Sequence, residues 1–412
     1  MIVANMPRCN VMKIMKFYKN NKYNHAKNIF NDSSLKSNNF HSTRTIHNNK
    51  LIACFTGQGS QFPGMASELY QTDQTAKYMI DEADEALGYK LSDIMFDTSS
   101  KTTSSLTLTS NAQPAILLYS IIMLEKYMKN KLNCKHVKDA GYHIALGHSL
   151  GEYTALVATG SISLKDGVKL VHKRGMAMQK AVTVSNDNDN QQYGMYALMP
   201  TTYENALELC ETINNSNTND TMIVSNVANH NAKQQVVISG HIDAMEQVIS
   251  LGKEKKYIRR ATKLDVSAPF HSYYMKPAVI ELKDVLDEIE FHDPMIPIVS
   301  NVSGEIYDTS DGIKENLLDQ LCGKYFHLHV HIYTYIYFFL DKIVFWTNNN
   351  EMCIHMYAGT VQWCKSMDTV DDYHDNDMEM TWHEFGPKPI LSALIKKHFV
   401  AGKLIECESF CV

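Results

Sequence analysis

Two kinds of hydrophobic pattern follow one another along the chain. Residues 51–56 and 142–146 are short, mostly apolar runs of the kind that form buried strands. Residues 66–98, 113–124, 152–158 and 164–182 carry apolar side chains at helical spacing, and Pro114 lies near the predicted start of the second of these helices. Residues 102–110 are rich in Ser and Thr, so we expect a connection there.

A smaller set of elements begins after the polar loop at residues 186–192. The pattern predicts strands at 194–199, 222–225 and 235–239, and helices at 203–213 and 243–251. This order, over roughly 70 residues, is typical of a small ferredoxin-like domain. We therefore predict a ferredoxin-like subdomain at 185–266, inserted between two core segments at 51–184 and 267–412.

Composition and length set the broad class. The 412 residues, 44% apolar and 20% charged, can hold one large α/β domain with a smaller insertion in a soluble protein. The net charge of −6 argues against a general nucleic-acid binder. The nine cysteines form no C-x-x-C pair and no ligand-like spacing with histidine. We expect thiols in a reducing compartment, and no metal site.

Residues 1–50 differ from the rest of the chain. They contain nine Lys or Arg residues and one acid, Asp32, and are rich in Asn and Ser. They lack the apolar run of a secretory signal. A basic, acid-poor leader with hydroxyl side chains is typical of an organelle transit peptide, so we predict targeting to the mitochondrial matrix, with a plastid as the alternative. A disordered basic tail, or a start codon assigned too early, would give the same composition.

The strongest chemical signal is a G-x-S-x-G pattern, formed by Gly147, His148, Ser149, Leu150 and Gly151. It lies between a predicted strand and a predicted helix, which is the context in which this pattern indicates a nucleophilic serine. The tight turn leaves little room for neighbouring side chains, and the serine oxygen lies where free backbone N–H groups favour negative charge. The pattern alone occurs by chance in loops, so the prediction of a nucleophilic Ser149 depends on its context.

Several further candidate residues could equally have ordinary structural roles. Gly57, Gln58 and Gly59 follow the first strand and either donate an N–H to an oxyanion or form a strand-to-helix turn. Arg174 lies in a predicted helix, and most arginines in helices are exposed to solvent. His271 is an isolated histidine, and most such histidines have a structural role. A basic patch, either a solvated face or a docking surface for an acidic partner, comprises Lys253, Lys255, Lys256, Arg259, Arg260 and Lys263.

Together these motifs resemble the malonyl-CoA:acyl-carrier-protein transacylases of type II fatty-acid synthesis. The resemblance runs from Leu51 to Ile405, and several spaced motifs in one order are far more specific than a single G-x-S-x-G. It implies an α/β-hydrolase-like core with a parallel sheet and an inserted ferredoxin-like subdomain, with the active site between them. The motifs, in the family's order, begin at Gly57, Gly147, Arg174, Asn226, Gln235, Ala268 and Glu384.

The resemblance implies a ping-pong transfer of malonate from malonyl-CoA to the phosphopantetheine thiol of acyl carrier protein, through an ester on Ser149. His271 would be the base and then the acid, oriented by the backbone carbonyl of Gln320. The N–H groups of Gln58 and Leu150 would bind the oxyanion. No cofactor, metal, nucleic acid or integral membrane association is implied, and we expect a monomer.

The same resemblance assigns the substrate contacts. Arg174 would hold the malonyl carboxylate by paired hydrogen bonds, and Phe270 would exclude an α-methyl group. His148, Met178 and Asn229 complete the expected substrate-binding set. Arg259 and Arg260 lie where the family contacts its acidic carrier protein.

Residues 324–359 depart from the family, in which the Gln320 motif runs directly into a sequence like that from Val361. Their composition, dense in Tyr, Ile, Phe, His and Asn, is that of translated AT-rich non-coding DNA. The flanking codons can carry intron borders, and removal leaves the reading frame intact, so our hypothesis is a retained intron. The alternative, a membrane-associating hairpin, is weakened by three histidines and Asp341 within the apolar run. If translated, the segment predicts poor folding or aggregation.

Two other functions stay open from the sequence alone. An α/β-hydrolase-type esterase or thioesterase would need an acid in a triad with Ser149 and His271, and an apolar pocket. Asp243 and Asp265 lie between them in sequence, but no motif supports either. A non-catalytic carrier-protein binder would not need the intact Ser149 and His271.

Overall fold

The computed structural model describes residues 50–99, 103–185, 193–216, 224–266, 268–322, 359–373, 379–399 and 405–411. Residues 48–412 form one compact unit, and residues 1–47 a separate one. The predicted targeting leader therefore lies outside the described residues, apart from Lys50. The predicted insertion at 324–359 also lies outside them, apart from Gly359.

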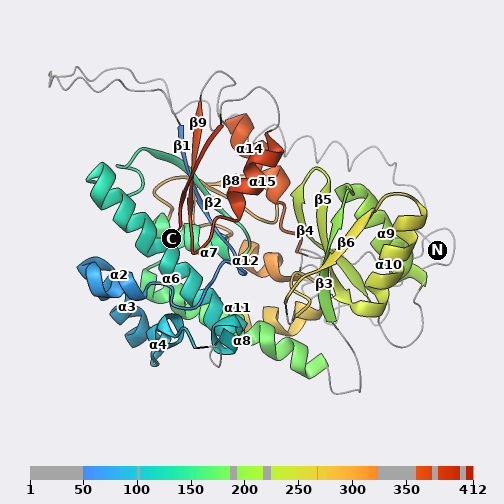
Figure 1. The fold of residues 1–412 in the computed structure, drawn as a ribbon, viewed down its shortest axis with the longest axis horizontal. Helices are drawn as coiled ribbons and strands as arrows, with labels where there is room; N and C mark the ends of the chain where they lie inside the picture. Colours follow the sequence, from blue (N-terminus) through green and yellow to red (C-terminus); the bar gives the residue numbers. More distant parts are fainter. Residues whose placement is uncertain are drawn as a thin grey trace, which may run out of the picture. The chain divides into compact units, whose positions relative to one another are not determined.

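The larger part of the compact unit is built on a six-stranded sheet with the order β10-β9-β1-β2-β7-β8 (Figure 1). Its pairs are parallel except for β7 with β8. Alternate residues of β1 point to opposite faces: Ala53 and Phe55 join one apolar cluster, and Ile52 and Cys54 join another. The strands are β1 (Lys50–Phe55), β2 (Tyr142–Gly147), β7 (Ile298–Val299), β8 (Ile306–Tyr307), β9 (Met380–Phe385) and β10 (Ile405–Phe410).

Helices cover both faces of this sheet, as a mostly parallel sheet requires. The smaller cluster is closed by α14 (Trp363–Tyr373) and α15 (Leu391–His398). The larger cluster is closed by the remaining core helices. These are α2 (Ser67–Thr72), α3 (Gln74–Leu87), α4 (Leu91–Phe96), α5 (Thr103–Thr107), α6 (Thr109–Tyr127), α7 (Leu150–Ala158), α8 (Leu164–Ser185), α11 (Lys276–Asp287) and α12 (Ile313–Cys322), with short turns η1 (Met128–Leu132) and η2 (Tyr273–Met275).

The expected connection at 102–110 is wrong, because α5 and the start of α6 occupy most of it. Burial of Leu106 in the larger cluster outweighs the modest helix propensity of Ser and Thr. Pro114 is consequently inside α6, not in its first turn. Because proline has no N–H, the carbonyl of Ser110 lacks its helical donor, and the Nδ1 atom of His172 lies 2.8 Å from that oxygen.

The smaller part follows the order β-α-β-β-α-β of a ferredoxin-like unit (Figure 1). The sequence pattern predicts the ferredoxin-like fold and its first five elements, but not the last strand, β6. Its antiparallel sheet has the order β4-β5-β3-β6. The predicted strand at 222–225 is displaced: the observed strand begins at Ser225 and continues through polar residues to Ala232. The elements are β3 (Tyr193–Met199), α9 (Tyr203–Ser216), β4 (Ser225–Ala232), β5 (Gln235–His241), α10 (Ile242–Glu254) and β6 (Arg260–Lys263).

Residues 360–362 join the two sheets. The N–H of Val361 donates to Ala228 of β4 at 2.8 Å, and the N–H of His230 donates to Val361 at 2.9 Å. The next N–H, of Gln362, donates to the carbonyl of Asn301 at 2.7 Å. This short stretch therefore contacts β4 and the loop after β7 at once.

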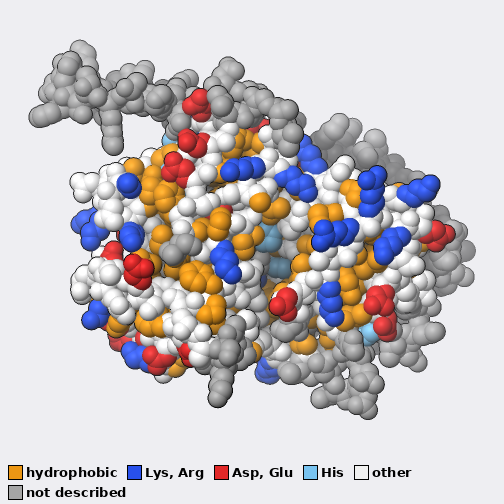
Figure 2. Space-filling model, in the orientation of Figure 1, with side chains coloured by type: hydrophobic (Ala, Val, Ile, Leu, Met, Phe, Trp, Pro, Cys, Tyr) orange, Lys and Arg blue, Asp and Glu red, His pale blue; other side chains and the backbone are white. Residues whose placement is uncertain are grey.

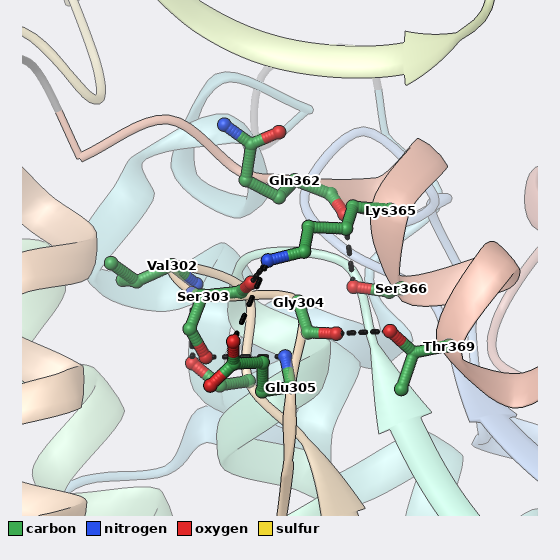
Figure 3. A network of polar contacts seen from close by, with 9 residues as sticks. Val302, Ser303, Gly304, Glu305, Gln362, Lys365, Ser366 and Thr369 are labelled. Atoms are coloured by element: carbon green, nitrogen blue, oxygen red, sulfur yellow. Dashed lines mark hydrogen bonds and ion pairs between the residues drawn. The ribbon is translucent and has the colours of Figure 1, made fainter. Parts of the chain in front are cut away.

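Helix α14, which follows this stretch, is fixed to the loop after β7 (Figure 3). The ammonium of Lys365 donates to the carbonyl of Ser303 at 2.5 Å and lies 3.8 Å from the carboxylate of Glu305. The hydroxyl of Thr369 donates to the carbonyl of Gly304 at 2.5 Å. These contacts fix the position of the loop after β7, which contains Asn301.

Candidate active site

Ser149 has the strained backbone that the sequence pattern predicts, with φ 51° and ψ −101°, immediately before α7. The residues two positions to each side of Ser149 must be glycine, because a side chain there would clash with the backbone. A Cβ atom on Gly147 would lie 2.1 Å from the carbonyl carbon of Gly151, and one on Gly151 would lie 2.1 Å from the carbonyl oxygen of Phe55. The turn can therefore form only with the backbone packed directly against β1.

Ser149 and His271, far apart in sequence, are hydrogen-bonded. The Oγ atom of Ser149 lies 2.8 Å from Nε2 of His271, and Nδ1 of His271 lies 2.7 Å from the carbonyl oxygen of Gln320. A carbonyl can only accept, so Nδ1 carries the proton and Nε2 is free to accept the serine proton. Burial and the nearby Arg174 lower the pKa of His271 to about 3, so the ring is a neutral base at physiological pH.

Arg174 reaches the nucleophile from α8 and is 2% exposed. One terminal guanidinium nitrogen, Nη1, donates to Oε1 of Gln113 at 2.8 Å. The other terminal nitrogen, Nη2, donates to Oε1 of Gln320 at 2.9 Å and to Oγ of Ser149 at 3.3 Å. The guanidinium also lies over the ring of Tyr153, 4.9 Å from its centroid. All these partners are uncharged. The site thus holds a buried cation beside the nucleophile, without a carboxylate in ion-pair contact in the described chain.

Gln320 does more than orient His271. Its side-chain Nε2 donates to the carbonyl of Ser149 at 3.1 Å and to Oε2 of Glu152 at 2.7 Å. Glu152 is fully buried and also accepts from the N–H of Asn301 at 3.3 Å and the hydroxyl of Tyr307 at 3.4 Å. Burial raises its pKa to about 7.

Asn301 holds the turn that carries the nucleophile through two hydrogen bonds. Its Oδ1 accepts the N–H of Ser149 at 2.6 Å, and its Nδ2 donates to the carbonyl of Gly147 at 2.7 Å. Sequence reasoning missed Asn301 and Glu152. The one signal in the sequence is that Glu152 directly follows the G-x-S-x-G pattern.

The two predicted oxyanion donors lie beside the turn. Leu150 is the first residue of α7, where a backbone N–H has no partner inside the helix. Gln58 follows Gly57, whose Cβ position would be 2.6 Å from the carbonyl oxygen of His148. The side chain of Gln58 donates to Thr109 of α6 at 3.2 Å. Their role as oxyanion donors stays a prediction.

Comparisons with known proteins agree with this geometry. The profile of the family described as "Acyl transferase domain" matches residues 54–312. The malonyl CoA-acyl carrier protein transacylase of Bacillus subtilis strain 168 is 41% identical over 272 residues, which is 66% of this chain and 78% of that protein. The chain belongs to the malonyl CoA-acyl carrier protein transacylase family.

Solved structures from this transacylase family have the same fold. The acyl-carrier-protein S-malonyltransferase of Bartonella henselae is 29% identical, with a TM-score of 0.69 over 88% of this chain and 96% of that one. A malonyl-transacylase in complex with a type II PKS acyl-carrier protein is 25% identical, with a TM-score of 0.67 over 88% and 96%. Ser149, Arg174 and His271 lie within the matched family range, and Gln320 lies beyond it.

The other residues expected to bind substrate in a transacylase of this family have these positions. Nε2 of His148 lies 2.8 Å from Oδ1 of Asn231, so the turn is linked to β4 of the small sheet. The sulfur of Met178 accepts from Gln113, the partner of Arg174, at 3.5 Å. Phe270, 6% exposed, packs in the larger cluster. Asn229 forms a backbone bridge with Val361. Their contacts with substrate stay predictions.

Arg259 and Arg260 are exposed at the end of the small sheet. Figure 2 shows several Lys and Arg side chains over this sheet, and histidine side chains in the hollow between it and the larger part. The described residues contain no group of three or more His, Cys, Asp or Glu suited to a metal ion. None of the described helices is both long and apolar enough to cross a membrane.

Proposed function

We propose that the protein transfers the malonyl group of malonyl-CoA to the phosphopantetheine thiol of acyl carrier protein, and so supplies fatty-acid synthesis. The observation that carries this proposal is the position of Arg174, 3.3 Å from Oγ of Ser149 and surrounded by neutral acceptors. A cation beside a nucleophile favours an acyl group that carries its own negative charge.

In the first half of the reaction, Oγ of Ser149 attacks the thioester carbonyl of malonyl-CoA while Nε2 of His271 takes the serine proton. The carbonyl of Gln320 stabilises the imidazolium that forms, through the hydrogen bond at Nδ1. The negative charge on the substrate oxygen would be bound by the N–H groups of Gln58 and Leu150. The C–S bond then breaks, the coenzyme A sulfur takes the proton from His271, and the malonyl ester of Ser149 remains.

The second half runs the same steps with a different thiol. The phosphopantetheine thiol gives its proton to His271 and its sulfur attacks the ester carbonyl. The C–O bond breaks, and Oγ of Ser149 recovers the proton from His271. The malonyl thioester of the carrier protein leaves, and the enzyme returns to its starting protonation state.

Selection of malonate over acetate follows from the burial of Arg174. A malonyl carboxylate can accept paired hydrogen bonds from the guanidinium, whereas an acetyl group leaves the charge buried and unpaired. Leaving a buried charge unpaired costs several kcal/mol, which is enough for strong discrimination. Phe270, directly before His271, is proposed to exclude an α-methyl group.

The esterase alternative requires an acid on His271, and the structure has a backbone carbonyl there. Asp243, with a side chain 68% exposed, lies beside His241 at the start of α10. Asp265 is also exposed. The Ser149–His271 pair and Arg174 together support acyl transfer more strongly than a triad hydrolase or a non-catalytic binder.

The exposed Arg259 and Arg260 are proposed to contact acyl carrier protein, because a basic patch on a chain of net charge −6 is complementary to an acidic partner. A relative of this family has been solved with a carrier protein bound. We also infer delivery to the mitochondrial matrix, with a plastid as the alternative, from the basic, acid-poor composition of residues 1–50. Imaging a reporter fused to residues 1–50 tests the localisation.

Intact-protein mass spectrometry tests the reaction. Incubation with malonyl-CoA should add one malonyl group, on the peptide that contains Ser149, and the Ser149→Ala variant should acquire none. Adding phosphopantetheinylated carrier protein should remove the adduct and malonylate the carrier. Release of free malonate without transfer would overturn the proposal in favour of a hydrolase, and the absence of any adduct would reject covalent catalysis.

A further inference from the structure

Two buried, opposite charges lie on either side of one amide group. Oε1 of Gln320 accepts from Arg174 at 2.9 Å, and Nε2 of the same amide donates to Glu152 at 2.7 Å. An amide has one accepting and one donating end, so this pairing fixes its orientation. Glu152 thereby determines which end of Gln320 faces the guanidinium.

Neither charge forms an ion pair within the part of the chain that the structure describes. Glu152 accepts only from the amide of Gln320, the N–H of Asn301 and the hydroxyl of Tyr307. Arg174 donates only to neutral oxygens. Both residues are buried, so each senses the other electrostatically through Gln320 with little screening by water.

The titratable groups compared with Glu152 come from α7, β8, α8 and the segment before η2, and among them the pKa of Glu152 is the one near neutrality. Its own pKa is raised to about 7 by burial. Burial raises the pKa of Tyr153 in α7 to about 12 and that of Tyr307 in β8 well above its usual value. The pKa of His271 is shifted down to about 3, and Arg174 of α8 stays a cation. Of these groups, Glu152 is the one whose pKa lies near 7, so we assign a charge change there to Glu152.

We propose that Glu152 is a positioning residue for Gln320 whose protonation is linked to the occupancy of Arg174. The inference rests on the proposed function, because it concerns an acyl group that brings a carboxylate to the guanidinium. In the free enzyme above pH 7, the Glu152 carboxylate balances the charge of Arg174. When the substrate carboxylate arrives, the site holds two anions and one cation, and Glu152 binds a proton.

The geometry permits both protonation states without turning Gln320. One carboxyl oxygen of Glu152, Oε2, accepts from Gln320, and the other, Oε1, faces the hydroxyl of Tyr307. A proton on Oε1 can be donated to the Tyr307 oxygen while Oε2 continues to accept. An acetyl group brings no charge, so it leaves Glu152 ionised.

Calorimetry of ligand binding tests the link. Malonyl-CoA is titrated into the Ser149→Ala variant, which cannot form the ester, in buffers of different ionisation enthalpy between pH 6.5 and 8.5. We expect net uptake of a fraction of a proton above pH 7, and an affinity that falls with rising pH, by at most about tenfold per pH unit. Acetyl-CoA, which shares the ionising groups of coenzyme A, is the control and should give no such uptake.

The Ser149→Ala, Glu152→Gln double variant keeps an acceptor for Gln320 but cannot ionise. It should bind malonyl-CoA without the additional proton. Binding by Ser149→Ala without proton uptake, or uptake that persists in the double variant, overturns the inference. If the double variant does not fold, the comparison of malonyl-CoA with acetyl-CoA on Ser149→Ala still decides. Failure of malonyl-CoA to bind at all would instead reject the proposed function.

Discussion

The carbonyl oxygen of Gln320 accepts the Nδ1–H of His271 at 2.7 Å, in the position where many hydrolases have a carboxylate. A carbonyl fixes the tautomer and orientation of the ring but adds no full negative charge. With Arg174 nearby, a histidine held in this way is a weak base that returns its proton readily to a leaving thiolate. This suits a reaction in which His271 returns its proton twice, first to the coenzyme A sulfur and then to Oγ of Ser149.

Removing the side chain of Gln320 should separate its two roles. Gln320→Ala keeps the backbone carbonyl on His271 but removes the hydrogen bonds to Arg174, Ser149 and Glu152. Loss of charge-assisted hydrogen bonds costs about 2 kcal/mol, so we expect malonyl transfer to fall by roughly thirtyfold. Steady-state kinetics with malonyl-CoA measures this, and an unchanged kcat/KM would contradict the bridging role of the side chain.

Arg174→Ala should change the preferred acyl group. The variant loses the partner of the malonyl carboxylate, at a cost of about 3 kcal/mol or more, so malonyl loading should fall at least about a hundredfold. Acetyl loading or hydrolysis should increase, because no unpaired cation remains. Competition between malonyl-CoA and acetyl-CoA, read by mass spectrometry, gives the ratio. Arg174→Lys is the control, and it should restore only part of the selectivity because it lacks the paired donors.

Glu152→Gln should change how stability depends on pH. The pKa of Glu152 is raised from 4.5 to about 7 on folding, so the unfolded chain loses this proton first and wild-type stability falls as pH rises from 4.5 to 7. The Glu152→Gln variant has no ionisable group at this position and so lacks this pH-dependent contribution to stability. Its stability relative to wild type should therefore increase across that window, by up to about 3 kcal/mol, and level off above pH 7. Urea unfolding at several pH values measures the difference, and a constant difference would reject the raised pKa.

Gly151→Ala should prevent formation of the active turn, because its Cβ would lie 2.1 Å from the backbone oxygen of Phe55. We expect little folded protein and no malonyl adduct. Gly194→Ala in β3 is the matched control, since its nearest neighbours would be side-chain atoms at 3.8 Å and 3.9 Å. Soluble yield and circular dichroism compare the two. Normal activity in Gly151→Ala would show that the turn differs from the one described.

Deletion of residues 324–359 should leave an active enzyme. Gly359 packs so closely on α12 that a Cβ there would lie 2.2 Å from the carbonyl oxygen of Asp319 and 2.4 Å from that of Gln320. In the deletion variant Gly323 precedes Thr360, so a glycine can again occupy this position. We expect higher soluble yield and retained malonyl loading. An inactive deletion variant, or full-length sequencing that finds these codons in the main transcript, would reject the retained-intron hypothesis.

Parts of the site with a local signal can be predicted from the sequence, and parts made by packing cannot. The turn at Ser149 is encoded in neighbouring residues, because its glycines and its flanking strand and helix are contiguous. His271 and Arg174 are candidates only through the family resemblance, since their approach to Ser149 depends on how α8 and η2 pack. Glu152 follows the motif, but nothing local shows that it meets Gln320 of α12.

The start of β4 differs from its predicted position for a related reason. Its polar residues do not alternate with apolar ones in the usual way, because several of them have partners outside the small sheet. Asn226 accepts the N–H of Tyr273 at 3.0 Å, and Asn231 pairs with His148. A strand that contributes polar side chains to a neighbouring site loses the apolar signal from which strands are recognised.

The stretch from Thr360 to Gln362 has a mechanical consequence. Its amides and carbonyls bind β4 on one side and Asn301 on the other, and Asn301 in turn holds the N–H of Ser149. The small sheet and the turn at Ser149 are therefore both connected by hydrogen bonds to the same stretch of backbone. Moving the small sheet away from the large one would break the hydrogen bonds of this stretch and, through Asn301, disturb the support of the turn at Ser149, so we expect the two sheets to keep their relative position during turnover.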